Sequence, residues 1–321
     1  MNTQSKIEQV AVVGTGLIGS SWTALFLARG LRVSATDPAP NAERELRAQV
    51  EGIWPVLEKI GLSPGASPDR LAFSRDLATA VSSADFVQEN GPERMEYKVR
   101  MFADLDAILP PKVILASSTS GLTMSQVQAE CRHPARCVIG HPFNPPHLIP
   151  LVEVVGGAAT SADTVERAEA FYTWLGKRAI RLHKEVPGHV ANRLQAALWR
   201  EAVHLVAEGV VSVTDVDAAV SWGPGLRWGA MGPNLIFHLG GGTGGIEHFM
   251  HHLSGPFASW WDDLGRPVLD PQLKAKIIQG VHEESGGRSI SELAAERDDI
   301  IVNLITMRQE REHRQPRSTA S

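Results

Sequence analysis

The first half of the chain alternates short apolar runs with longer stretches in which apolar residues recur at helical spacing. The short runs are nearly continuous rather than alternating with polar residues, which is typical of strands buried on both faces of a parallel sheet. On this pattern we predict strands at Gln9–Val13, Leu31–Thr36, Phe86–Gln88, Val113–Ser117, Cys137–Gly140, Leu151–Val155 and Ala179–Leu182.

Helical periodicity fills the segments between these strands. The helices predicted there are Leu17–Arg29, Asn41–Ile60, Arg94–Ile108 and Ala162–Leu175. Strands that alternate with helices indicate right-handed crossovers, and therefore an α/β domain built on a doubly wound parallel sheet.

The pattern changes after Pro187-Gly188. The later segments with helical periodicity are Val190–Ala207, Val213–Ser221, Pro271–Gly280 and Ser289–Arg311, and no convincing strand accompanies them. A chain of 321 residues is also too long for one ordinary core. We therefore expect a sheet domain over residues 1–186 and an all-helical domain over residues 187–321.

Composition narrows the functional classes. The hydrophobic fraction of 43% and the charged fraction of 21% are those of a globular protein. The net charge of −5 provides no basic field for nucleic acid or an anionic membrane. The sequence shows neither a membrane span nor a signal-peptide pattern, and Cys131 and Cys137 are expected to be reduced thiols near the surface. We expect a cytoplasmic protein that acts on a small molecule.

A glycine-rich motif joins the first predicted strand to the first predicted helix. Its residues are Gly14, Thr15, Gly16, Leu17, Ile18 and Gly19. In this context the motif is the fingerprint of a dinucleotide-binding Rossmann domain, in which the glycines allow a tight turn, approach of the pyrophosphate and close helix packing. The positive end of the helix dipole would face the pyrophosphate. The alternative is a glycine turn without a ligand.

Asp37 directly follows the second predicted strand. A carboxylate at this place accepts hydrogen bonds from the adenosine-ribose hydroxyls and repels the additional phosphate of NADP. No arginine comes immediately after it. We therefore predict NAD rather than NADP as the cofactor.

Two polar segments follow neighbouring strands, Ser117–Gly121 and His141–Pro145. Both are expected at the carboxyl ends of strands, where doubly wound sheets bind ligands. Glu153 lies in the next strand, and Asn192 lies at the start of the helical domain.

Oxidation of an alcohol requires groups of these kinds. A hydride leaves a carbinol carbon only as a base removes the hydroxyl proton; histidine suits this task, and a carboxylate fixes its tautomer. Neutral donors such as Ser120 and Asn192 stabilise charge on the reacting oxygen. The alternative is that His141 merely caps a turn and that Glu153 is a surface strand residue.

The segments GTGLIGSSW, QENGPER, SSTSGL, GHPFNPP followed by LVEVV, and PGHVANR resemble the 3-hydroxyacyl-CoA dehydrogenase superfamily. The likeness runs from about residue 8 to about residue 310. Within the superfamily the chain is most similar to the bacterial L-carnitine dehydrogenase branch, through GHPFNPPHLIPLVEVVGG, ALWREAVHL and GPGLRWGAMG, and next to the lambda-crystallin/L-gulonate dehydrogenase branch. The resemblance implies a Rossmann domain followed by a helical domain like that of 6-phosphogluconate dehydrogenase, and a homodimer.

The resemblance also implies roles for individual residues. His141 would be the catalytic base, and Glu153 would hold its imidazole. Ser120 and Asn192 would hydrogen-bond the reacting oxygen, with Ser120 also near the cofactor. Asn144 would help to position the substrate and the nicotinamide, and Glu93 would lie near the nicotinamide-ribose side.

The substrate is expected to be a small 3-hydroxy acid, with L-carnitine first. The segment from Asn41 to Gly61 balances three basic residues with four glutamates, which departs from the cationic pattern that a CoA ester needs. L-gulonate, a short 3-hydroxyacyl-CoA and a non-enzymic, crystallin-like NAD(H)-binding role remain alternatives.

The helical domain is rich in tryptophan, and aromatic faces attract a trimethylammonium ion. Trp222 and Trp228 are predicted to bind this group, and Arg193 and Arg227 to bind a carboxylate. The alternative is that the tryptophans fill a core or a dimer interface.

Two further motifs stay outside this scheme. Gly240–Gly245 has no accompanying strand or lysine and is interpreted as a tight loop rather than a phosphate loop. His248, His251 and His252 are close in sequence, but hydride transfer needs no metal, and we predict no metal site.

Overall fold

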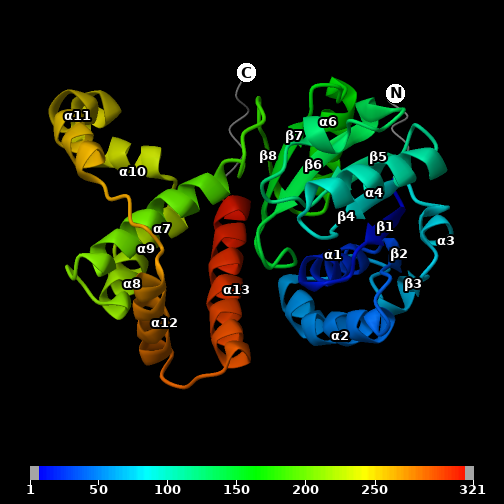
Figure 1. Ribbon diagram of the computed structural model, residues 1–321, viewed down its shortest axis with the longest axis horizontal. Coiled ribbons are helices and arrows are strands. Elements are labelled where there is room, and N and C mark those ends of the chain that lie inside the picture. The colour runs from blue at the N-terminus through cyan, green and yellow to red at the C-terminus, as the bar shows by residue number, and fades with distance from the viewer. Residues whose placement is uncertain (1–6, 315–321) are drawn as a thin grey trace. The chain divides into compact units, whose positions relative to one another are not determined.

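The computed structural model describes residues 7–314, which belong to two compact units divided between Asn192 and Arg193 (Figure 1). The first unit is an α/β sheet domain and the second is helical, which confirms the predicted fold class. The division falls a few residues after the expected boundary, within the first turn of a helix.

The first unit is built on one eight-stranded sheet with the order β3-β2-β1-β4-β5-β6-β7-β8. Its strands are β1 (Gln9–Val13), β2 (Arg32–Thr36), β3 (Leu71–Phe73), β4 (Phe86–Glu89), β5 (Ile114–Ser117), β6 (Cys137–Pro142), β7 (Leu151–Gly156) and β8 (Arg178–Arg181). The strands from β3 to β6 run parallel, whereas β7 is antiparallel to β6. The short strand β3 was not predicted.

The predicted parallel sheet contains one strand whose direction the sequence analysis did not foresee, β7, which is antiparallel to β6. Residues 143–150 connect β6 to β7. A parallel neighbour needs a crossover of about a dozen residues or more, so this short loop returns the chain antiparallel. The same loop leaves His141 inside β6, not beyond its end as predicted.

Helices cover both faces of the sheet (Figure 1). One face packs against α1 (Leu17–Ala28), α2 (Ala42–Ile60) and α6 (Ala162–Trp174). The other packs against α3 (Leu77–Val81), α4 (Met95–Ile108) and α5 (Met124–Val127). Because both faces are covered, the central strands are apolar throughout, as their sequences indicate.

An aromatic cluster holds α1 and α6 on the sheet. Trp22 of α1 stacks on Phe26 at 5.2 Å and lies 5.6 Å from the ring of Tyr172 on α6. Tyr172 in turn meets Phe86 of β4 edge-on at 5.8 Å. All four side chains are fully buried, so the helix that begins at the glycine-rich motif is fixed by packing beneath it.

The cysteines differ from expectation. Cys137 begins β6 and is completely buried, and its sulfur lies 3.8 Å from that of Cys131. The prediction that both thiols lie near the surface is therefore wrong for Cys137, which is part of the core between the sheet and α4 and α5.

The second unit contains seven helices within the described residues. They are α7 (Ala191–Ala207), which starts at the division, α8 (Val213–Trp222), α9 (Pro224–Ala230), α10 (Pro233–Gly240), α11 (Gly245–Asp263), α12 (Pro271–Ser285) and α13 (Ile290–Arg314). No helix in the described part of the chain is long and apolar enough to cross a membrane. A small cluster formed by Val206, Val213 and Val216 packs α7 against α8.

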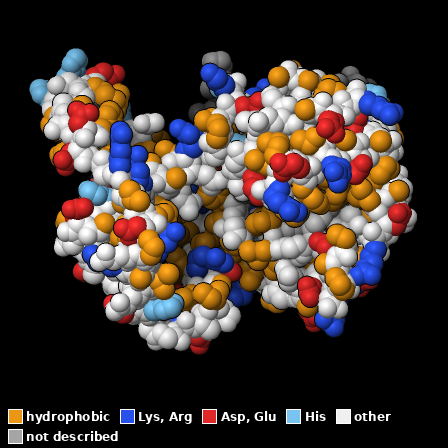
Figure 2. Space-filling model, in the orientation of Figure 1, with side chains coloured by type: hydrophobic (Ala, Val, Ile, Leu, Met, Phe, Trp, Pro, Cys, Tyr) orange, Lys and Arg blue, Asp and Glu red, His pale blue; other side chains and the backbone are white. Residues whose placement is uncertain are grey.

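Large apolar side chains remain exposed on the second unit, and Figure 2 shows hydrophobic atoms spread over the surface of these helices. Trp222 is 78% exposed, Trp261 68% and Ile290 84%.

Proline and glycine explain the helices that the sequence analysis missed or shortened. Pro224 and Pro233 occupy the first turns of α9 and α10, where proline favours helix initiation. Gly280 does not end α12; a Cβ there would lie 2.4 Å from the Val213 side chain, so glycine allows α12 to pack closely on α8. The helix ends instead at Gly286, which adopts a left-handed conformation with φ of +59°.

A buried ion pair links α4 to the residue that precedes β6. Arg136 donates to Asp106 of α4 at 2.7 Å, and both side chains are nearly inaccessible. Burial raises the pKa of Asp106, but hydrogen bonds from Arg136 and from two backbone N–H groups outweigh it and lower the net pKa. The carboxylate is therefore charged in the folded protein.

Replacing Asp106→Asn is expected to lower the free energy of unfolding by about 3–5 kcal/mol, because Arg136 would keep a buried charge without its partner. Since folding lowers the pKa of Asp106, its contribution is present above the unfolded pKa of about 4 and is lost as the pH falls below it. Urea unfolding at pH 7 and pH 3 measures both effects. The exposed pair Arg167–Asp163 offers the control, since Asp163→Asn should cost less than about 1 kcal/mol; equal losses would contradict the assignment.

Candidate active site

The glycine-rich motif forms a tight loop between β1 and α1. Gly14 has φ of +86°, and a Cβ there would meet the backbone of Asn90 at 2.9 Å. A Cβ on Gly19 would meet the Gly14 carbonyl oxygen at 1.9 Å, whereas a Cβ on Gly16 would meet nothing within 4 Å. Gly14 and Gly19 thus serve the close packing of the loop, and Gly16 faces open space where a ligand can approach the backbone.

The amino-terminus of α1 fits a pyrophosphate. Helix α1 has twelve residues with Gly16 at its N-cap, and no side chain of the described residues caps it. The first N–H groups of such a helix need an acceptor, which an anion supplies. Leu17 is 64% exposed and Thr15 is buried, so the open side of the loop is formed by Gly16 and Leu17.

Asp37 lies beside this loop. One of its oxygens accepts from the Thr15 backbone N–H at 2.8 Å and the other from the Ala39 N–H at 2.9 Å. The carboxylate is therefore held in place by the backbone on both sides. Arg75, which follows β3, donates to the Ala39 carbonyl at 3.1 Å. A guanidinium that the sequence analysis did not consider therefore lies near the segment that follows Asp37.

The antiparallel ladder between β6 and β7 places His141 directly opposite Glu153. His141 Nδ1 lies 2.8 Å from Glu153 Oε2, and the two residues are 4% and 0% exposed. The alternative that Glu153 is a surface strand residue is therefore wrong. With Nδ1 engaged by the carboxylate, Nε2 is the ring nitrogen left for chemistry.

A turn before α7 holds the second oxygen of Glu153. The backbone N–H groups of Val190 and Ala191 donate to Oε1 at 2.8 and 3.0 Å. Burial raises the pKa of Glu153, but the hydrogen bonds from His141, Ala191 and Val190 outweigh it, so that the net pKa lies below the ordinary value. The carboxylate stays charged beside the imidazole.

The loop after β5 meets the same turn. Asn192 Nδ2 donates to the Ser120 carbonyl oxygen at 3.0 Å, and one hydrogen of that amide group remains for another acceptor. Glu93 Oε1 accepts from the Thr119 hydroxyl and from the N–H groups of Ser120 and Gly121 at 2.6 to 3.0 Å. In this structure Glu93 thus orders the Ser120 loop.

Beneath this loop lies a buried ion pair that the sequence analysis missed. Lys98 Nζ lies 2.9 and 3.0 Å from the two oxygens of Glu89. Glu89 also accepts from the Ser117 hydroxyl at 2.7 Å and from the Gly91 N–H at 2.6 Å. Its only sequence signal is the acidic residue that ends β4.

A polar chain links the glycine-rich loop to the strand of His141. Ser118 donates to Asn90 at 2.7 Å, and Asn90 is the residue whose backbone contacts Gly14. Ser118 accepts from Gln88, which in turn accepts from Tyr172 at 2.6 Å.

Tyr172 is packed against Gly140, the residue before His141. A Cβ on Gly140 would lie 1.9 Å from the Tyr172 hydroxyl oxygen, so only glycine fits at this point of β6. The glycine-rich loop and the strand of His141 are therefore parts of one connected core.

The loop from Phe143 to Pro150 is held from below by Lys177. This buried lysine donates to the carbonyl oxygens of Pro146 and Ile149, and its Nζ lies 5.2 Å from the centre of the Trp22 ring. Burial lowers the pKa of Lys177 to about 7. Asn144, predicted to position substrate, is an exposed residue of this loop.

Four predicted substrate-binding residues belong to the helical unit: Arg193, Trp222, Arg227 and Trp228. Trp222 ends α8, whereas Arg227 and Trp228 lie in α9. Trp222 is strongly exposed, and Trp228 is 38% exposed. Their role in binding substrate stays a prediction.

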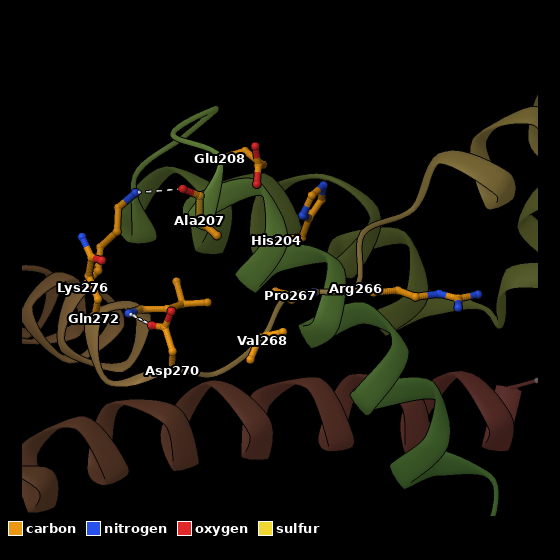
Figure 3. A pocket seen from close by; sticks show the side chains of 10 residues that line it. His204, Ala207, Glu208, Arg266, Pro267, Val268, Asp270, Gln272 and Lys276 are labelled. Atoms are coloured by element: carbon orange, nitrogen blue, oxygen red, sulfur yellow. Dashed lines mark hydrogen bonds between the residues drawn. The ribbon is translucent and has the colours of Figure 1, made fainter.

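The helical unit has a separate cavity of about 500 Å³, lined by α7, α12 and the segment between α11 and α12 (Figure 3). Lys276 donates to the carbonyl oxygens at the end of α7, and Asp270 caps α12 through the Leu273 N–H at 2.8 Å. These two charged groups therefore make hydrogen bonds to the ends of the helices that line the cavity.

The remaining motifs also lie in this unit. Gly240–Gly245 is a tight turn between α10 and α11, in which a Cβ on Gly241 would meet the Gly245 carbonyl oxygen at 1.7 Å. The rings of His248 and His252 lie 4.3 Å apart on α11. Within residues 7–314 no group of three or more side chains is arranged to hold a metal ion.

Family models cover most of the chain. The model for the NAD-binding domain of 3-hydroxyacyl-CoA dehydrogenase matches residues 9–186, and the model for the C-terminal domain of the same family matches residues 188–280. The family and the cofactor predicted from the motifs are thereby confirmed.

Curated relatives match over nearly their whole length. The chain is 50% identical to the L-carnitine dehydrogenase of Streptomyces coelicolor, over 95% of this chain and 96% of the relative. It is 46% identical to the L-carnitine dehydrogenase of Pseudomonas putida, over 94% of each chain. Among solved structures, the 5-dehydrogenase of 5-formyl-3-hydroxy-2-methylpyridine 4-carboxylic acid, an NAD⁺-dependent dismutase, is 30% identical with a TM-score of 0.81, over 94% of this chain and 98% of that one.

Asp37→Ala is expected to weaken NAD⁺ binding about tenfold, because the ribose hydroxyls would lose a charged acceptor. It should also relax discrimination against NADP⁺, because the carboxylate would no longer repel the extra phosphate and the nearby Arg75 could bind it. Titration of NADH and NADPH by fluorescence measures both constants. Adding Arg75→Ala to this variant should abolish any gain for NADPH; unchanged constants in Asp37→Ala would refute the role of Asp37.

Proposed function

We propose that this chain, which belongs to the 3-hydroxyacyl-CoA dehydrogenase family and is an NAD-dependent oxidoreductase, oxidises L-carnitine to 3-dehydrocarnitine. The observation that carries the chemical part is the buried His141–Glu153 pair at the end of β6. The identity of 46 to 50% to L-carnitine dehydrogenases over nearly the whole chain supports the choice of substrate.

His141 would act as the general base. Its Nδ1–H donates to Glu153, which leaves an unprotonated Nε2 to accept the proton of the substrate hydroxyl. The imidazolium that forms is stabilised by the charged Glu153, itself fixed by Val190 and Ala191. NAD⁺, when bound, supplies the acceptor for the hydride.

Ser120 and Asn192 would bind the reacting oxygen. The two residues already touch through the Asn192 amide and the Ser120 carbonyl. The Ser120 hydroxyl and the second amide hydrogen of Asn192 are neutral donors, which stabilise negative charge on the oxygen as the proton leaves. Glu93 would fix the backbone that presents Ser120, and Asn144 would orient the substrate from the opposite loop.

The cofactor would lie across the carboxyl ends of β1, β4 and β5. Gly14, Gly16 and Gly19 form the loop that admits the pyrophosphate, with the N–H groups of Leu17 and Ile18 at the helix terminus.

Substrate selection would come from charge and aromatic surface. The trimethylammonium group of carnitine suits the faces of Trp222 and Trp228, and its carboxylate suits Arg193 and Arg227. On α2, three basic residues are balanced by four glutamates, and Arg47 is paired with Glu43 at 2.8 Å, so the helix offers no net positive charge to the phosphates of a CoA ester. This favours a small zwitterionic substrate over a CoA ester.

A purified preparation with NAD⁺ should form NADH with L-carnitine, and faster than with L-gulonate or 3-hydroxybutyryl-CoA. Absorbance at the NADH band measures each rate. Turnover of another 3-hydroxy acid without turnover of carnitine would overturn the substrate assignment, and no turnover of any would support the crystallin-like alternative.

His141→Ala should lower kcat for carnitine about a hundredfold or more, because the hydroxyl proton loses its acceptor. NADH affinity should stay within about twofold, since the cofactor loop is untouched. Glu153→Gln is the matched variant: while its oxygen accepts from Val190 and Ala191, its amide NH2 faces His141 Nδ1 and favours the Nε2–H tautomer, which cannot accept the hydroxyl proton, so kcat should also fall about a hundredfold or more. Wild-type kcat in His141→Ala would contradict the base assignment.

We also propose a homodimer formed through the helical unit, because exposed apolar side chains such as Trp261 and Ile290 need cover. Light scattering should give twice the 34.8 kDa of one chain. A mass of one chain at micromolar concentration would contradict this assembly.

A further inference from the structure

His189 lies in the first unit between the base and the Ser120 loop, and the mechanism above does not use it. His189 is 1% exposed, and the centre of its ring lies 5.1 Å from that of the His141 ring. Its Nε2 lies 3.1 Å from the Thr119 carbonyl oxygen. One side chain therefore bridges the strand of the base and the loop that presents Ser120.

The backbone of His189 is also unusual. It has φ of +50°, and it is the one non-glycine residue between 7 and 314 recorded with a positive φ. This left-handed conformation is unfavourable for a residue with a Cβ. Directly after it, the N–H groups of Val190 and Ala191 turn onto Glu153. His189 is thus strained at the point where one turn makes hydrogen bonds both to the Glu153 carboxylate and to the Thr119 carbonyl oxygen.

The hydrogen bond fixes the tautomer of His189. Since a carbonyl oxygen can only accept, Nε2 must carry the proton, and a neutral ring then has a bare Nδ1. This Nδ1 is buried and has no hydrogen-bond partner among the described residues. Protonation there would create a buried N–H without an acceptor, which is costly.

The surroundings of the ring also favour the neutral form. Burial lowers the pKa of His189, and the neighbouring His141 lowers it further. The Thr119 carbonyl and the carboxylates of Glu153 and Glu93 act in the opposite direction, but the net pKa is below the ordinary value. A second cation beside His141 would oppose its protonation, whereas a neutral ring does not.

We infer that His189 is a positioning residue of this enzyme: a permanently neutral imidazole, protonated at Nε2, that holds the Thr119–Ser120 backbone against the His141–Glu153 pair. The inference rests on the role proposed for His141. His189 itself takes no proton; it acts through the place it gives to Ser120 and His141.

Two substitutions separate the hydrogen bond from ring packing. His189→Gln places an amide nitrogen near Nε2 and keeps the donor to Thr119, whereas His189→Phe keeps a buried ring and loses the donor. His189→Phe is expected to lower kcat about a hundredfold with little change in KM, as for a reacting group displaced by a fraction of an ångström to an ångström. His189→Gln should retain most of kcat. NADH affinity and the midpoint of urea unfolding should be similar in both.

Wild-type kcat in His189→Phe, or equal losses in both variants, would overturn the inference. A second measurement on the wild-type protein does not depend on the folding of a variant or on turnover. Long-range ¹H–¹⁵N spectra of histidine-labelled protein should show one ring as the neutral Nε2–H tautomer from pH 5.5 to 8.5, within about 5 Å of a second imidazole by nuclear Overhauser contacts. A charged ring or an Nδ1–H tautomer at this position would also overturn it.

These readouts distinguish this inference from the proposed function. If no 3-hydroxy acid is oxidised but the spectra show the neutral tautomer, the proposed function fails and the tautomer assignment stands. If carnitine is oxidised equally well by wild type and His189→Phe, only the positioning role fails.

Discussion

The cross-strand pairing of His141 with Glu153 is the constraint on which the rest of the site depends. It exists because β7 returns antiparallel to β6, which sets the two residues opposite each other in the ladder. Neighbouring residues in a sheet alternate between its faces, so a shift of one position would send one of the two side chains to the other face. The register of this hairpin therefore determines whether the imidazole has a carboxylate partner.

The elements around the pair leave it little freedom. Lys177 holds the loop that connects the two strands, and the turn before α7 holds the second oxygen of Glu153. On the opposite side, Glu93 orders the loop of Ser120. The contacts of Lys177 and Glu153 use polar groups that are buried or partly buried, where an unpaired partner would be costly, whereas Glu93 is exposed. The site is thus organised by hydrogen bonds between loops that the parallel strands bring to one edge.

Much of this could be predicted from sequence because local patterns determine it. Apolar runs indicate the buried strands, and the glycine motif needs only its neighbouring strand and helix to be interpreted. The direction of β7 could have been inferred from the short connection after Pro142. The role of His189 could not, since it depends on a left-handed backbone and on Thr119, a residue distant in the chain. The same holds for Lys98 and Glu89, whose pairing arises only when α4 packs beneath the sheet edge.

The contact between Gly140 and Tyr172 has a consequence for how this sequence can diverge. Because the phenol ring occupies the volume that any side chain at position 140 would need, the two positions are not independent. A lineage can acquire alanine at position 140 only after Tyr172 has been replaced by a smaller residue. That replacement would also remove the hydroxyl that donates a hydrogen bond to Gln88. A side chain at position 140 should therefore appear only among descendants in which position 172 already carries a smaller residue.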